Sequence, residues 1–132
     1  MTETSDLTQI GLSIKMHPHL EALKHDGYFS EMRDAYRFAI AVAIVKGGIP
    51  PEIQAKRQTI FATPTVDPDG SLAAAIRALM PCEEIPPYRW AERLAEVGVE
   101  ILATKSAQGR LDISAMLIEA ENSAANAMPE TE

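Results

Sequence analysis

The chain has 132 residues, a length typical of one domain that buries its own core, and a net charge of −7. This acidic total argues against broad non-specific binding to nucleic acid, because that binding requires clustered Lys and Arg. A single cysteine, Cys82, excludes an intrachain disulfide framework and indicates a reducing compartment. The N-terminus resembles no secretory signal and the longest apolar run, Phe38 to Val45, is too short to span a bilayer. We therefore expect a cytoplasmic protein without a membrane segment.

The first predicted element is a strand. Residues 1–8 are polar and are expected to be flexible, whereas residues 9–16 alternate strictly between polar and apolar side chains. A lone strand needs a partner, because its backbone N–H and C=O groups must be satisfied. The preferred partner is the same strand of a second copy, and the alternative is the short extended segment RQTIFAT (57–63) of the same chain.

Two helices follow this strand. Pro18 suits the first position of a short helix over residues 18–25. Ser30 is a plausible N-cap for a longer helix that ends at Gly47. Because Phe38 to Val45 is apolar on all sides, this helix is predicted to be the central, fully buried element.

The remainder of the chain is also predicted to be helical. Residues 71–80, with Ser71 as the cap, residues 88–107 and residues 111–128 all show helical spacing of apolar side chains. Gly98 lies inside the second of these helices and indicates a kink or break there.

The predicted fold is a single, mainly α domain of about five helices with one short N-terminal strand. Its predicted limits are residues 9–122, with a flexible N-terminus at 1–8 and a flexible acidic tail at 123–132.

The N-terminal elements resemble the ribbon-helix-helix family. The resemblance is carried by the strand (10–16), the short helix (18–25), the glycine-containing turn (27–29) and the longer helix that begins at Ser30. In that family two copies pair their strands antiparallel, and the outward side chains enter the DNA major groove. The resemblance therefore implies a homodimer that binds DNA.

The same resemblance assigns roles to five residues. It places Gln9, Ser13 and Lys15 on the outward face of the ribbon, where amide, hydroxyl and amine groups contact bases or phosphates. It places Ser30 and Arg33 next to phosphates, at the free N–H groups that begin the second helix.

A second resemblance covers FSEMRDAYRFAIAVAIVKGG (29–48) together with YRWAERLAEVGVEIL (88–102). These stretches are similar to small accessory proteins of bacterial DNA sulfur-modification and phage-defence loci. The resemblance implies a partner protein of a DNA-handling machine rather than an enzyme.

The chemistry-bearing residues give little support to catalysis. His17 and His19 point in different directions at a helix start, and no further ligand completes a metal site. Cys82 is followed by two glutamates, which disfavour a reactive thiolate. We therefore expect no catalytic residue, no metal and no cofactor. Trp90, with its neighbour Arg89, is either a core residue of its helix or a partner-binding hot spot.

Two functional hypotheses follow from these patterns. The first is a non-catalytic, DNA-associated or regulatory accessory protein of the ribbon-helix-helix type that acts as a homodimer. The second is a protein-interaction adaptor that does not bind DNA, with the acidic helices as its docking surface.

Overall fold

The computed structural model describes residues 6–118, and the protein is mainly α-helical with a short strand near its N-terminus. Within this range no helix is both long enough and apolar enough to cross a membrane. The predicted tail at 123–132 lies outside the described residues. The elements in chain order are β1 (Gln9–Ser13), α1 (His17–His25), α2 (Met32–Lys46), β2 (Arg57–Ala62), α3 (Thr63–Val66), α4 (Ser71–Leu79), α5 (Pro87–Ala107) and a helical segment over residues 113–118.

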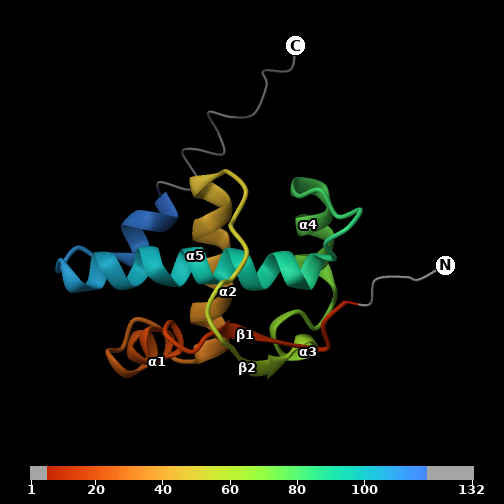
Figure 1. The fold of residues 1–132 in the computed structure, drawn as a ribbon. Coiled ribbons are helices and arrows are strands. Elements are labelled where there is room, and N and C mark those ends of the chain that lie inside the picture. Colours follow the sequence, from red (N-terminus) through yellow and green to blue (C-terminus); the bar gives the residue numbers. More distant parts are fainter. Residues whose placement is uncertain (1–5, 119–132) are drawn as a thin grey trace, which may run out of the picture.

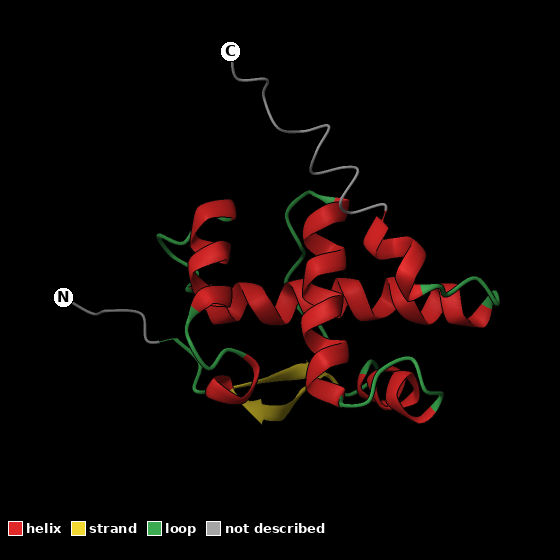
Figure 2. Ribbon diagram, turned by 180° about the vertical axis from the view of Figure 1, so that it is seen from behind, coloured by secondary structure: helices red, strands yellow, loops and turns green. Residues whose placement is uncertain are grey.

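Helix α5 is the axis of the fold (Figure 1). Helix α2 crosses it steeply and extends to both sides. The two strands, α1 and α3 lie on one side of α5, whereas α4, the helical segment 113–118 and the C-terminal half of α2 lie on the other (Figure 2). The buried apolar core lies where α2, α5 and β1 meet.

Helices α2 and α5 cross in close contact at Gly98. Helix α5 continues through it without a break, so the expected kink is absent. A Cβ at this position would lie 1.8 Å from the carbonyl oxygen of Ala39 in α2. Glycine is therefore needed here because the two backbones touch, and not because the helix bends.

The N-terminal strand pairs within its own chain. Strand β1 runs antiparallel to β2, with Gln9 opposite Ala62 and Ser13 opposite Arg57, and a bulge disturbs the ladder between Ile10 and Gly11. Of the two partners that the sequence left open, the segment RQTIFAT is the one that the structure shows. The strand is also shorter than expected: it ends at Ser13, and the last backbone contact to the neighbouring segment is the hydrogen bond from the Ile14 N–H to the Lys56 carbonyl at 2.8 Å.

Helix α4 is capped by a buried aspartate rather than by Ser71. The carboxylate of Asp67 accepts hydrogen bonds from the backbone N–H groups of Leu72 (2.9 Å) and Ala73 (3.0 Å). It also accepts one from the hydroxyl of Tyr88 at 2.8 Å, which ties α4 to the start of α5. Ser71 instead donates to Asp69, and these hydrogen bonds lower the pKa of the Asp69 carboxyl.

The burial of α2 differs from the prediction. Ala39, Ile40 and Ala43 are buried as expected, but Val45 is 50% exposed. The reason is topological: α2 is longer than the layer that covers it, so its C-terminal turns extend beyond α5 (Figure 2). The prediction of a fully buried helix is therefore wrong for this half of α2.

Candidate functional site

Side chains of helix α5 accept hydrogen bonds from the edge of β1 that faces away from β2. The carboxylate of Glu92 accepts the backbone N–H of Gly11 at 2.9 Å, and Glu96 accepts both the backbone N–H (3.0 Å) and the hydroxyl (2.5 Å) of Ser13. The Tyr36 hydroxyl donates to the Gly11 carbonyl at 2.7 Å. Strand β1 thus has a strand on one edge and side chains of α5 and α2 on the other.

Glu92 is the buried charge of this network. Only 6% of its side chain is exposed, and both of its oxygens accept from the Arg57 Nε, at 2.7 and 2.9 Å. The Arg57 side chain extends from β2 past β1 and also donates to the Gln9 carbonyl at 3.1 Å. The hydrogen bond to Glu92 raises the pKa of the Arg57 guanidinium, so Arg57 keeps its positive charge throughout the physiological range.

A cavity of about 210 Å³ opens beside this ion pair, and we call it the arginine cavity. Its polar lining consists of three arginines and two glutamates. Arg57 comes from β2, whereas Arg89 and Arg93 lie one turn apart on α5. The full lining is Leu7, Glu52, Ile53, Arg57, Arg89, Glu92 and Arg93.

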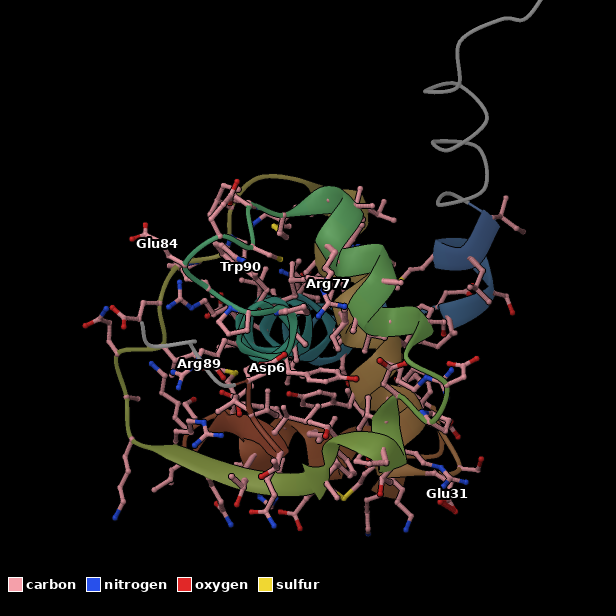
Figure 3. The ribbon with its side chains drawn as sticks, turned by 90° about the vertical axis from the view of Figure 1, so that its right-hand side faces the viewer. Asp6, Glu31, Arg77, Glu84, Arg89 and Trp90 are labelled. Atoms are coloured by element: carbon pink, nitrogen blue, oxygen red, sulfur yellow. The ribbon has the colours of Figure 1, made fainter. Side chains whose placement is uncertain are left out.

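Of the two residues expected to bind a partner, Arg89 lines this cavity and Trp90 does not. Arg89 is exposed and projects away from the body of the molecule, whereas Trp90 lies under the loop that follows α4 (Figure 3). Trp90 is 3% exposed and its indole N–H donates to the Pro81 carbonyl at 3.0 Å. Trp90 is therefore a core residue, and the hot-spot interpretation is wrong for it.

The three residues predicted to face DNA do not share one open face. Gln9 and Lys15 are exposed, but Ser13 is fully buried against Glu96. The prediction of an outward Ser13 is wrong, because its backbone N–H and its hydroxyl face the Glu96 carboxylate of α5 rather than solvent. No spacing rule within residues 9–16 reveals acceptors that lie about eighty positions further along the chain.

The two predicted phosphate contacts lie elsewhere. Helix α2 begins at Met32 with Glu31 as its cap residue, so Ser30 lies outside the helix and does not cap it. Arg33 is about half exposed and pairs with Glu31 at 3.7 Å. Glu31 and Arg89 are on opposite sides of the molecule (Figure 3), so this pair of residues is not part of the arginine cavity.

A second surface was missed by the sequence reasoning. The C-terminal ends of α2, α4 and the segment 113–118 point to the same side of α5 (Figure 1). They carry large apolar side chains that are each at least half exposed, and we call this set the apolar end. Its members are Val45, Ile49, Leu79, Leu117 and Ile118.

The pKa values of two tyrosines lead us to expect a loss of stability at alkaline pH. Burial raises the pKa of Tyr36 well above its usual value, and burial with the hydrogen bond to Asp67 raises the pKa of Tyr88 to about 12. A tyrosine of the unfolded chain loses its proton near pH ~10, so above that pH the unfolded state binds fewer protons than the folded state. We expect the free energy of unfolding to be insensitive to these groups below pH ~10 and to fall as the pH rises towards ~12.

Urea unfolding at a series of alkaline pH values measures this slope. Tyr88→Phe should make the decline shallower, because one of the two shifted groups is removed. A free energy of unfolding that stays constant over this pH range would contradict the prediction.

Among residues 6–118, no group of three or more His, Cys, Asp or Glu side chains is placed to hold a metal ion. Burial raises the pKa of the Cys82 thiol, which disfavours its thiolate. Comparison with protein-family models, with curated proteins and with solved structures gives no match to this chain.

Proposed function

We propose that this protein is a non-catalytic accessory protein that works as a protein-interaction adaptor and docks through its apolar end. The observation that carries the proposal is that the C-terminal ends of three helices point to the same side of α5 (Figure 1), and that these ends, or the residues just after them, carry five large apolar side chains that are each at least half exposed. Exposed apolar groups that gather on one face mark protein contacts.

The composition of this region supports a protein partner. Residues 35–49, 71–80 and 113–118 contain no Asp or Glu, although the chain has 19 of them. The same ranges do contain Arg37, Lys46 and Arg77, so what they lack is acidic side chains, and protein interfaces are likewise depleted of Asp and Glu. A helix that is apolar on all sides is normally buried, so the exposed half of α2 is expected to be covered by another chain. A second copy of this protein is one such chain.

The test is a double substitution in the apolar end, Val45→Asp with Leu79→Asp. Covering a valine or leucine side chain is worth ~1.5–3 kcal/mol, so losing two should weaken docking by about 100-fold or more. The control, Ala22→Asp with Gln108→Asp, adds the same charges at exposed positions away from this surface. Light scattering after size exclusion measures self-association, and affinity capture with each variant as bait measures docking to other proteins.

The expected result is a defined complex formed by the wild-type and control proteins and lost in the apolar-end variant, with all three equally folded by circular dichroism. A wild-type protein that is monomeric and captures nothing would contradict the proposal. So would an apolar-end variant that forms the same complexes as the control.

Association with DNA is a second candidate, supported by basic residues that gather near β1. Lys15 and Arg93 line a groove whose other charged residues are Glu52, Glu96 and Glu100. Arg93 also lines the arginine cavity, with Arg57 and Arg89. A ribbon made from β1 would have to displace Glu92 and Glu96 from the edge of this strand. The surface that would approach the phosphates is therefore the one that carries these basic residues, and not a ribbon. Titration with duplex DNA tests the proposal: a steep salt dependence that is weaker in Lys15→Ala supports it, and absence of binding at low salt contradicts it.

A further inference from the structure

The arginine cavity concentrates positive charge in an acidic protein. It holds three of the seven arginines of the chain, whereas acidic residues outnumber basic ones by 19 to 12 overall. Arginine supplies a planar set of N–H donors that matches the oxygens of an anion. The distribution of these three residues is therefore the first indication of an anion site.

The carboxylates of the lining leave much of this charge uncompensated. Glu92 is already engaged by Arg57 and by the backbone N–H of Gly11. Glu52 is 70% exposed and approaches Arg93 only to 3.9 Å, a geometry that contributes little. Within the described part of the chain, no carboxylate lies at ion-pair distance from Arg89.

The positions of Arg89 and Arg93 are unfavourable for the isolated protein. They are four residues apart on α5, so their like charges repel each other along one face of the helix. They also lie in its first two turns, close to the positive end of the helix dipole. Asp6 accepts a hydrogen bond from the Tyr88 N–H there, at 3.0 Å, but it does not line the cavity.

The Arg93 guanidinium is also held in place. It lies 5.3 Å from the centre of the buried Trp90 ring, and 19% of its side chain is exposed. Stacking on an aromatic face fixes the plane of the guanidinium, so less freedom is lost when it binds an anion. Trp90 thus contributes to this site from the core, by positioning its neighbour.

We propose that the arginine cavity binds a phosphate group, either free or as a monoester on a larger molecule. Its volume of about 210 Å³ is smaller than the ~300–1,000 Å³ of sites for drug-sized ligands, so it fits one small group. A phosphate carries a charge of about −1.5 to −2 at neutral pH, which matches the two guanidiniums of Arg89 and Arg93. This site does not depend on docking at the apolar end, with which it shares no residue.

The experiment compares thermal unfolding and binding calorimetry in inorganic phosphate and in chloride at equal ionic strength. In phosphate, the wild-type protein should show saturable binding and a raised melting temperature. Arg89→Gln and Arg93→Gln should each weaken phosphate binding by about tenfold, because each removes a charged donor. Arg110→Gln, at an exposed position just beyond the C-terminal end of α5, is the matched control and should bind like the wild type.

The order of melting temperatures gives a second, independent readout. In chloride, Arg89→Gln should melt above the wild type, because the repulsion from Arg93 is gone. In saturating phosphate the order should reverse, so that Arg89→Gln melts below the wild type. This reversal separates a ligand-binding arginine from a structural one, since a structural arginine would lower the melting temperature in both salts when it is replaced.

Three outcomes would overturn the proposal: no saturation in the wild type, equal binding by the wild type and both cavity variants, or acetate binding as tightly as phosphate. O-Phosphoserine identifies the source of the group. If it competes with inorganic phosphate, the cavity accepts a monoester; if only inorganic phosphate binds, the ligand is the free ion.

Discussion

Gly98→Ala should lower the free energy of unfolding by about 3 kcal/mol or more, which is the opposite of the usual effect of this change in a helix. In a helix interior, alanine is normally favoured over glycine by ~1 kcal/mol. Here the added Cβ would lie 1.8 Å from the oxygen, 2.4 Å from the carbonyl carbon and 2.7 Å from the Cα of Ala39. The two helices would have to move apart, and the packing around their crossing would be lost. Urea unfolding followed by circular dichroism measures the effect.

A second variant shows whether backbone contact is the cause. All three nearest atoms belong to the backbone of Ala39, so trimming its side chain by Ala39→Gly should not rescue Gly98→Ala. Rescue would mean that side-chain crowding limits the crossing. A Gly98→Ala protein as stable as the wild type would show that α2 and α5 do not approach this closely.

Glu92→Ala should lower the free energy of unfolding by about 3 kcal/mol, because it leaves the Arg57 Nε–H and the buried Gly11 N–H without their acceptor. The estimate is at the low end for a broken buried ion pair, since 38% of the Arg57 side chain is exposed and can be hydrated. Glu100→Ala is the control: this residue is two turns further along α5 and is exposed. Glu100→Ala should change the free energy of unfolding by no more than ~0.5 kcal/mol.

The double variant Glu92→Ala with Arg57→Ala tests whether the two side chains act as a pair. Because each single change leaves a partner unsatisfied, the double variant should lose less stability than the sum of the two single ones. Strict additivity would show that Glu92 acts on β1 alone, through Gly11. A Glu92→Ala protein that loses no more stability than Glu100→Ala would contradict the network described for β1.

The helices were predictable because their signals are local. Apolar spacing, proline at helix starts and glycine after helix ends placed α1, α2, α4 and α5 within a few residues of their observed bounds. The segment RQTIFAT was recognised as an alternative partner for β1 because it has the composition of a short strand, although pairing with a second copy was preferred. The mainly α-helical fold with its N-terminal strand is confirmed.

The errors have a common physical origin in contacts between distant parts of the chain. Ser13 was assigned to an outward face because its acceptor, Glu96, is 83 positions away. Gly98 was interpreted as a weak point of a helix because nothing local indicates the backbone of Ala39. Val45 was expected in the core because composition does not show that α2 extends beyond the layer that covers it. Arg89 was singled out from sequence, but the arginine cavity that it shares with Arg57 was not, because these two residues are far apart in the sequence and meet only in the folded chain.

The acceptors that α5 provides for β1 also determine when this protein can fold during synthesis. Strand β1 leaves the ribosome early, but the carboxylates that bind its N–H groups follow more than 80 residues later. At ~5–20 residues per second, the strand waits about 4–16 s for them. We therefore expect that the strand and two helices of the first 46 residues do not fold as an autonomous unit, although their order suggests one. We expect these elements to reach their final arrangement only after α5 has been translated, because the last long helix supplies the acceptors for the first strand.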